Sequence, residues 1–367
     1  MCYSFFNPPN FNDPKYKSAK SVNFLEVQKD GVAPENFYLT THLPTYYKLE
    51  DKWILPEHNS LNCVAVIDES IRIKEIRELK IGDKVVVGRT TDGSDGILIY
   101  KEGFNKSVYE NFGHSVESSF STNYDLLFKL MKYEKENKGH IVWVLGPSVV
   151  FDYDTRIALT HLAEAGFVNC LLGGNAIATH DLEGGYLNTA LGQNIYTQEN
   201  MPMGHYNHLD LLNEVRKSGS IKSFIDEGNV KNGFIKKLTE MDIPFVLAGS
   251  IRDDGPLPEV YSDVEDSIMK MKEQLNKATL VICLATMLHS VSAANLCSSY
   301  TVRENGMISP VYVYSIDVTE NVTRKIAAAR EMMAVRSIVT NVQDFVVNCE
   351  RALIEKEDIH EIQNADI

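Results

Sequence analysis

The chain has 367 residues, of which 44% are hydrophobic, and this length and composition predict a globular protein of two domains. Its net charge of −14 argues against nucleic acid or an anionic membrane surface as the main partner. No apolar run approaches the roughly 18 residues of a membrane span, and the start, MCYSFFNPPNFNDPKYK, lacks the features of a signal peptide, so we expect a cytoplasmic protein.

The first part of the chain predicts a small β-rich domain. Short β-type runs are separated by Asp, Gly, Pro and Asn turn signals, as in TTDGSDG at 90–96. The runs are FYLTTHLPTYYKL, DKWIL, LNCVAVID, IRIKEI, KVVVGR and GILIY. This pattern is typical of a compact antiparallel sheet or a small barrel. We therefore place a first domain at residues 1–120 and a second at 121–367.

From Asn123 onward, apolar runs alternate with helical patterns, which indicates βαβ units and a Rossmann-like, mostly parallel sheet. Helices are predicted over Tyr124–Glu136 and Thr155–Ala165, the second closed by Gly166. The predicted strands are Ile141–Leu145, Val168–Leu172, Pro244–Ala248, Leu280–Ala285, Val311–Ile316 and Ser337–Thr340. Each strand ends in small or polar residues, and open α/β sheets bind ligands at such strand ends.

The most informative strand end is the loop GSIRDDGP after Ala248. Asp253 and Asp254 could hold a cation, bind a substrate amine or act as a general base. Alternatively, one carboxylate pairs with Arg252 and the other caps the turn closed by Gly255. A functional site is favoured over this structural alternative, because burying two adjacent carboxylates at a strand end costs free energy unless a partner compensates their charge.

Other strand ends offer a dinucleotide site and a proton carrier. Asp317 could accept hydrogen bonds from the adenosine ribose, which favours NAD over NADP, or it could cap the following helix. The GxGxxG fingerprint is absent, but Gly146-Pro147-Ser148 and Gly173-Gly174-Asn175-Ala176 could each present backbone amides to a phosphate. His289 could carry a proton near neutral pH.

Metal and thiol chemistry are not expected. His180, Asp181, His205 and His208 match no standard metal spacing, so we predict no metal. The six cysteines form no CxxC pair, and Cys170 and Cys283 lie in apolar runs, as buried structural thiols do. The pattern assigns no role to Cys63 or Cys297.

Five segments carry a resemblance to a known family: GNAIATHDLE, GHYNH, RKSGSI, PFVLAGSIRDDGPLPEV and LATMLHS. They resemble the LOR/SDH group, named after lysine–oxoglutarate reductase/saccharopine dehydrogenase. That group includes the NAD-dependent archaeal-type ornithine cyclodeaminases and the C-terminal half of cyanobacterial arginine dihydrolase/ornithine cyclodeaminase proteins. The resemblance covers most of the chain and implies a small β-rich domain followed by a Rossmann-like NAD domain.

The resemblance also implies a set of dinucleotide contacts. Carried over position by position, they are Asn175, Ala176, Asp254, Thr286, Met287, Leu288, His289, Asp317, Asn341 and Val342. Two positions depart from the usual pattern: Asn341 stands where Asp is usual, and Gly173 stands where Ala is usual. The loss of charge at Asn341 puts that one contact in question.

The implied activity is conversion of L-ornithine to L-proline and ammonia, a lyase reaction in which NAD takes a hydride from the substrate and returns it. We expect Asp253, Asp254 and His289 to be the catalytic residues, and the acidic loop suits a basic amino acid as substrate. Two alternatives stay open: an amino-acid or opine dehydrogenase with net NADH formation, and a non-catalytic NAD- or amino-acid-sensing protein. A homo-oligomer is expected, while the sequence leaves open its size, the strand order, which acid is the base, and ornithine against lysine or another diamine.

Overall fold

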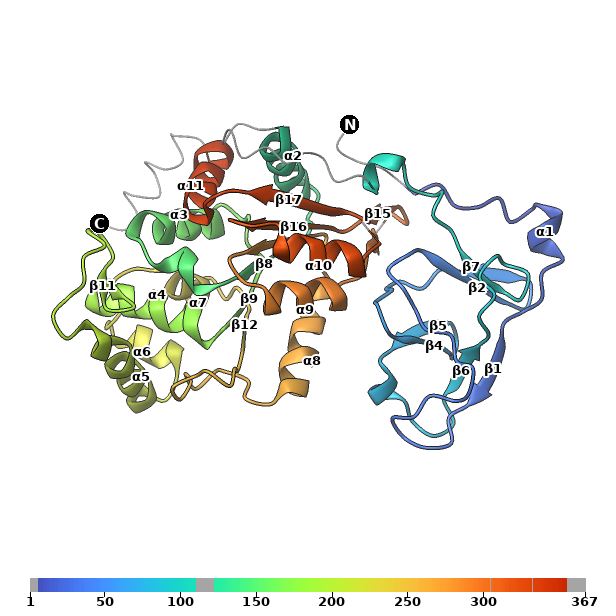
Figure 1. The fold of residues 1–367 in the computed structure, drawn as a ribbon, viewed down its shortest axis with the longest axis horizontal. Helices are drawn as coiled ribbons and strands as arrows, with labels where there is room; N and C mark the ends of the chain where they lie inside the picture. The colour runs from blue at the N-terminus through green and yellow to red at the C-terminus, as the bar shows by residue number, and fades with distance from the viewer. Residues whose placement is uncertain (1–5, 110–121, 304, 332, 355–367) are drawn as a thin grey trace. The chain divides into compact units, whose positions relative to one another are not determined.

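A computed structural model describes residues 6–109, 122–303, 305–331 and 333–354 (Figure 1). The chain forms two compact units, and each is described by itself. The first unit takes its described residues from 1–111, 294–312 and 324–335, and the second from 112–293, 313–323 and 336–367. The predicted domain boundary at residue 120 stays a prediction. Among the described residues, no helix is long and apolar enough to cross a bilayer.

The first unit contains two antiparallel sheets that share one apolar core. One sheet has the order β1-β6-β4-β5 and the other β3-β2-β7. Tyr47 of β2, Ala65 of β4, Val86 of β6 and Ile97 of β7 belong to the same buried cluster. The strands are β1 (Asn23–Glu26), β2 (Thr45–Leu49), β3 (Lys52–Ile54), β4 (Val64–Ile67), β5 (Ile71–Lys74), β6 (Lys84–Val87) and β7 (Ile97–Ile99).

Two segments from late in the sequence complete the first unit. One carries the hairpin of β14 (Tyr300–Val302) and β15 (Ile308–Pro310). The other carries Arg330, whose buried guanidinium donates to the carbonyl oxygens of Ala294 and Val311, each at 3.1 Å. The unit also contains α1 (Pro14–Lys17), η1 (Ile76–Glu78) and η2 (Lys106–Val108).

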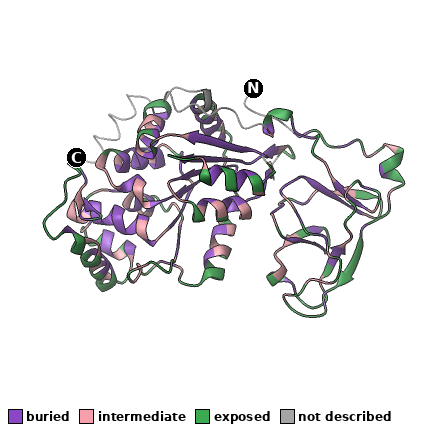
Figure 2. Ribbon diagram, viewed as in Figure 1, coloured by how far each residue is buried: buried purple, intermediate pink, exposed green. Residues whose placement is uncertain are grey.

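The second unit is built on a six-stranded sheet with the order β12-β9-β8-β13-β16-β17. Its strands are β8 (Ile141–Leu145), β9 (Cys170–Gly174), β12 (Phe245–Ala248), β13 (Leu280–Leu284), β16 (Tyr312–Asp317) and β17 (Val335–Val339). Numbered by appearance, this is the order 3-2-1-4-5-6 of dinucleotide-binding folds, with β12, β9, β8 and β13 paired in parallel. β8 and β13 are buried at every residue (Figure 2), as expected for strands covered on both faces.

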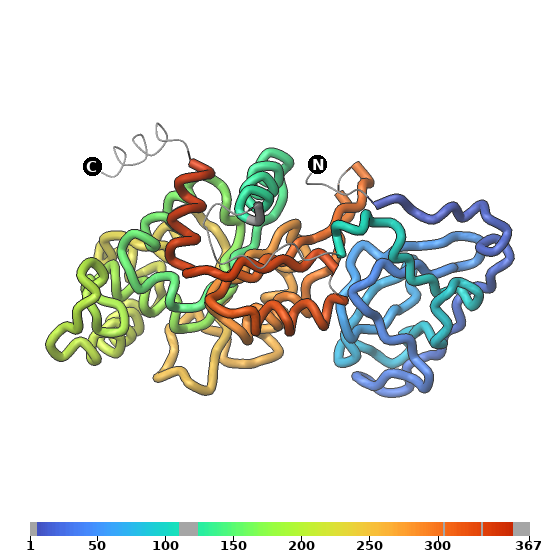
Figure 3. The backbone as a smooth tube through the Cα atoms, turned by 45° about the horizontal axis from the view of Figure 1, so that its top comes forward, coloured from blue at the N-terminus to red at the C-terminus, as the bar shows by residue number. Residues whose placement is uncertain are grey.

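Helices cover this sheet and bring distant parts of the chain together. α11 lies beside α2 and α3 (Figure 3), and α4 packs on α5 and α7. From residue 122 onward the helices are α2 (Thr122–Glu136), η3 (Pro147–Val150), α3 (Tyr153–Glu164), α4 (Asn175–Leu187), η4 (Gly204–Tyr206), α5 (Asn207–Ser218), α6 (Ile221–Asp226), α7 (Phe234–Glu240), α8 (Val264–Leu275), α9 (Leu288–Leu296), α10 (Asn321–Ala329) and α11 (Val342–Leu353). A short hairpin, β10 (Thr189–Ala190) and β11 (Gln193–Asn194), follows α4.

The predicted fold class is confirmed: an α/β protein with a Rossmann-like sheet and a β-rich N-terminal region. Gly166 ends α3 as expected, at φ +75°, with the Phe167 N–H bonded to the Leu162 carbonyl. Of the six predicted strands only Ile141–Leu145 has both ends as predicted; three others differ by one residue at one or both ends, and β9 and β17 differ most. β9 runs on through Gly173 and Gly174 because both pair with β12, and β17 begins at Val335 because its polar residues interrupt the apolar pattern.

Candidate functional site at the carboxyl edge of the parallel sheet

All the predicted site residues follow strands of this one sheet. Asn175 and Ala176 come directly after β9, the acidic loop follows β12, and Thr286 to His289 follow β13. Asp317 ends β16, and Asn341 and Val342 come after β17. Because the ladders of β12, β9, β8 and β13 are parallel, their carboxyl ends share one edge. The strand order reverses between β8 and β13, which is where such sheets bind ligands.

At the reversal point, the ends of β8 and β13 approach each other closely. The Gly146 N–H donates to the Leu284 carbonyl at 2.9 Å, and a Cβ on Gly146 would lie 2.0 Å from the Ala285 carbonyl oxygen. Ala285 has φ +53°, a left-handed conformation uncommon for alanine. Such conformations cluster at functional sites, and here one turns the chain into Thr286.

His289 lies against the ends of two strands. Its Nδ1 is 3.3 Å from Thr286 Oγ1, and a Cβ on Gly174 would come within 3.2 Å of the imidazole ring. Burial lowers the pKa of His289 below its usual value, while the negative charge of Asp253 acts to raise it. The imidazole of His289 therefore lies against Gly174, within the electrostatic influence of Asp253, and burial favours its neutral form, which can accept a proton.

The two acidic residues have different surroundings. The Asp253 carboxylate accepts a 2.8 Å hydrogen bond from the Ser250 N–H, so this residue caps the loop's own turn. The Asp254 side chain is 71% exposed and has Oδ2 3.7 Å from His208 Nε2. The expectation of two acids at a buried position is thus wrong, because the loop projects beyond the strand end and leaves Asp253 half-buried and Asp254 exposed. Of the alternative reading, the turn cap is found, at Asp253, whereas the structure shows no ion pair between Arg252 and either of the two acids.

Asn175 connects the β9 end to the acidic loop. Its side chain is buried, and Oδ1 accepts hydrogen bonds from the Leu257 N–H at 2.9 Å and the Thr179 hydroxyl at 3.3 Å. Ala176 follows as the second residue of α4. The first backbone N–H groups of this helix face the carboxyl edge, where a phosphate binds favourably.

Asp317 and Asn341 lie beside each other. The Thr340 N–H donates to the Asp317 backbone carbonyl at 3.0 Å. The Asp317 carboxylate accepts from the Thr319 N–H at 3.2 Å, whereas α10 begins only at Asn321. The alternative that Asp317 caps the following helix is therefore wrong, since Asp317 closes a local turn four residues before that helix.

Asn341 is the N-cap of α11. Its Oδ1 accepts from the Gln343 and Asp344 N–H groups at 2.9 and 3.1 Å, and Val342 begins the helix with a buried side chain. Asn and Asp are nearly equivalent caps. The departure from the usual Asp at this position therefore leaves the local structure intact.

We expect Asn341→Asp to leave the free energy of unfolding within about 0.5 kcal/mol of wild type, because Asp caps as well as Asn. Asn341→Ala removes the side-chain acceptor of these two amides and should cost about 1 kcal/mol. Urea unfolding of both variants checks this. Equal losses for Asp and Ala would contradict the capping role.

The four residues considered for a metal site each have a different partner in the structure. Asp181 is fully buried and bonds Arg156 Nε at 2.9 Å and the Ile235 N–H at 2.7 Å. His180 Nδ1 lies 2.8 Å from the buried carboxylate of Glu183. His205 is exposed against Tyr206, and His208 faces Asp254. Among the described residues, no three His, Cys, Asp or Glu side chains cluster as a metal site does.

Five cysteines are buried within the described residues, whereas Cys2 lies outside them. Burial raises the pKa of the Cys170 thiol to about 12 and that of Cys297 to about 11. Neither is a thiolate at neutral pH, so neither has the reactivity of a nucleophilic cysteine.

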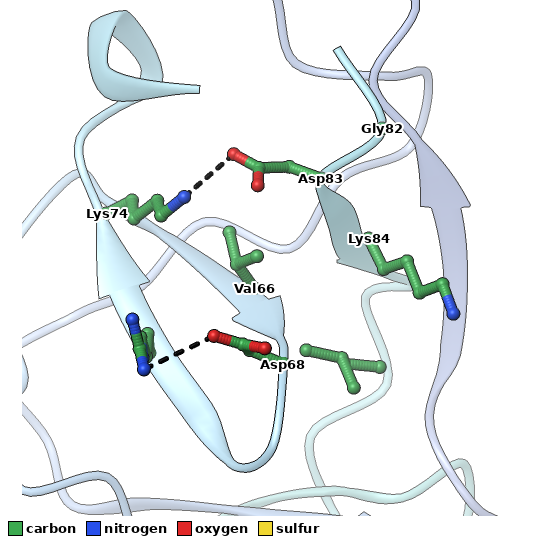
Figure 4. Close-up of a pocket in the computed structure, with 8 residues that line it drawn as sticks. Val66, Asp68, Lys74, Gly82, Asp83 and Lys84 are labelled. Atoms are coloured by element: carbon green, nitrogen blue, oxygen red, sulfur yellow. Dashed lines mark hydrogen bonds and ion pairs between the residues drawn. The ribbon is translucent and has the colours of Figure 1, made fainter. Parts of the chain in front are cut away.

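A cavity of about 400 Å³ in the first unit lies between β4, β5 and β6 (Figure 4). Its charges neutralise one another: Lys74 is 2.9 Å from Asp83, and Arg72 is 3.3 Å from Asp68. The Lys84 ammonium lies over the Phe24 ring, 5.3 Å from its centroid. The cavity contains none of the predicted site residues.

Comparison with known proteins agrees with this geometry. Residues 126–348 match the family described as "Arginine dihydrolase ArgZ-like, C-terminal, Rossmann fold". An Archaeoglobus fulgidus protein named ornithine cyclodeaminase is 39% identical over 286 residues, which cover 77% of this chain and 69% of the relative. A putative LOR/SDH protein from Methanococcus maripaludis S2 superposes with a TM-score of 0.77 at 30% identity, covering 91% of this chain and 98% of that one.

A third similar protein has been solved with ligands. The ternary complex of AgrE with ornithine and NAD⁺ matches with a TM-score of 0.56 at 27% identity, over 91% of this chain but 46% of AgrE. The chain thus spans less than half of that protein. From the family match and the archaeal relatives, this chain belongs to the ArgZ-like C-terminal family with a Rossmann fold.

Proposed function

We propose that this protein is an NAD-dependent ornithine cyclodeaminase that converts L-ornithine to L-proline and ammonia. The observation that carries the proposal is the gathering of the family's dinucleotide positions, together with Asp253, at one edge of a 3-2-1-4-5-6 sheet. The names of the archaeal relatives and the ligands of AgrE support the same substrate and cofactor. In this proposal, residues 121–367 form the catalytic domain.

The residues at the edge fit NAD. The N-terminus of α4 suits the pyrophosphate, and the Asp317 carboxylate suits the ribose hydroxyls. Large apolar side chains stand exposed just after three strands: Ile251 after β12, Met287 and Leu288 after β13, and Val318 after β16. Such exposure is costly in water and suits contact with the flat rings of a dinucleotide.

When bound, NAD would supply a reversible acceptor for the hydride of the substrate α-carbon. The protein's own task is to bind the diamine and to move protons between groups of the substrate. It need not supply or remove a proton overall, because the ornithine cation yields neutral proline and one ammonium ion. The neutral imidazole of His289, within the electrostatic influence of Asp253, is placed to accept a proton from a substrate amine. The exposed Asp254 carboxylate offers a counter-charge to an ammonium group.

The test measures release of proline and ammonia from L-ornithine, with NAD present in a much smaller amount than the ornithine to be converted. We expect many products per NAD and no accumulation of absorbance at the NADH wavelength, because the hydride returns to the substrate. Asp253→Asn should lower kcat by about 10²-fold or more while NAD still binds.

Other outcomes would replace the proposal. NADH formed in step with product would identify a dehydrogenase, and NAD binding without turnover of ornithine, lysine or other diamines would identify a sensor. Wild-type kinetics from Asp253→Asn would remove that residue from the mechanism. The homo-oligomer and the cytoplasmic location stay predictions, to be checked by sedimentation and by cell fractionation.

A further inference from the structure

Two sequence segments of the family resemblance, GHYNH and RKSGSI, received no role from sequence reasoning. The structure places both on or next to α5, and both contact the acidic loop between Gly249 and Val260. From the first segment, His208 faces Asp254. From the second, the Ile221 N–H donates to Glu259 Oε1 at 2.6 Å. α5 and α6 therefore contact the loop in its middle, at Asp254, and near its C-terminal end, at Glu259.

The strongest of these contacts comes from Arg216, in the last turn of α5. Its guanidinium donates to the backbone carbonyl of Gly255, and to that of Pro256 at 3.0 Å. Gly255 has φ +86°, and a Cβ there would lie 2.6 Å from an Arg216 terminal nitrogen. Glycine thus serves two purposes, since it permits the left-handed turn and leaves room for the guanidinium. A charged donor strengthens both hydrogen bonds.

The loop is anchored on its other side by Asn175. The bond from the Leu257 N–H to Asn175 Oδ1 fixes the residue immediately after the two carbonyls that Arg216 holds. The two acidic residues lie between these contacts on one side and the Ser250–Asp253 turn on the other, so both ends of this short segment are held in place. Arg216 is exposed, so its guanidinium is used in these contacts rather than in filling the core.

We propose that Arg216 is a positioning residue, which holds the acidic loop so that Asp253 keeps its bond to the Ser250 N–H and Asp254 stays beside His208. This inference rests on the proposed function, in which the two carboxylates meet the amines of the substrate. A loop already held in place loses less conformational entropy when substrate binds, which lowers KM. Loss of Arg216 should therefore raise KM for ornithine more than the Kd for NAD, because Asp254 is the only one of the expected dinucleotide contacts on this loop.

The experiment compares Arg216→Gln with Lys217→Gln in the full-length, NAD-loaded protein. Lys217 is the next residue of α5 and pairs with Glu214, so its replacement removes the same charge without touching the loop. Hydrogen exchange of the peptide covering 250–257, KM and kcat for ornithine, and the Kd for NAD are measured. A third variant, Arg216→Lys, retains the charge and one hydrogen-bond donor.

For Arg216→Gln we expect about tenfold faster exchange in this peptide and a comparable rise in KM, with the Kd for NAD within about twofold of wild type. Lys217→Gln should match wild type, and Arg216→Lys should recover part of the loss. Unchanged hydrogen exchange in Arg216→Gln would show that Arg216 does not hold the acidic loop. Faster exchange with an unchanged KM would show that holding the loop does not matter for substrate binding. If wild type does not turn over ornithine, the proposed function fails, while the exchange comparison still decides whether Arg216 holds the loop.

Discussion

Gly146→Ala is expected to destabilise the protein by about 3 kcal/mol or more, a large effect for one methyl group. The added Cβ would meet the Ala285 carbonyl oxygen at 2.0 Å. The obstacle is backbone, held by the parallel pairing of β8 with β13 and by the bond from Gly146 to Leu284, so it cannot rotate away. Relief requires the two central strands to separate at the point where the strand order reverses. We therefore also expect weaker NAD binding, measured by calorimetry alongside urea unfolding.

Gly166→Ala is the matched control. Gly166 has φ +75° but only the end of the Lys135 side chain, at 3.8 Å, near the added Cβ. Its replacement should cost about 1 kcal/mol, from the left-handed conformation alone, and leave NAD binding unchanged. Equal losses from the two variants would mean that β8 and β13 adjust freely, and that the close approach has no role in the site.

Asp181→Asn is expected to cost about 3–5 kcal/mol, because it leaves the buried Arg156 guanidinium without its counter-charge. The pair is almost completely buried, with side-chain exposures of 0% and 1%. The second carboxylate oxygen accepts from the Ile235 N–H near the start of α7, and Arg156 also donates to Asn232. One ion pair thus joins α3, α4 and the chain entering α7, and thermal or urea unfolding of the variant measures its contribution.

Two further variants test the cause of that loss. Asp210→Asn neutralises an exposed carboxylate on α5 and should change stability by less than about 0.5 kcal/mol. The double variant Arg156→Met with Asp181→Leu removes both charges and should recover part of the stability. A double variant no more stable than Asp181→Asn would show that the hydrogen bonds to the backbone, rather than the unpaired charge, dominate.

Much of the site was predictable because strand ends leave a local pattern. The run Ile141–Leu145 is β8 as predicted, and the acidic loop, Thr286 to His289 and Asp317 do lie just after strands. A buried parallel strand has to be continuously apolar and has to stop where the chain meets water. The sequence by itself therefore determined the fold class, the strand ends and the identity of the residues gathered there.

Tertiary structure alone decided which of those residues meet. The order 3-2-1-4-5-6 places β8 beside β13, although the two strands are far apart in sequence. This pairing creates the close approach of Gly146 to Ala285. The tertiary structure also shows that Asn175 and Arg216 hydrogen-bond to the acidic loop and that Asp181 forms a buried ion pair. A hydrogen bond between such residues depends on how helices pack over the sheet. That packing is set by the sum of many contacts distant in sequence, and no local pattern records it.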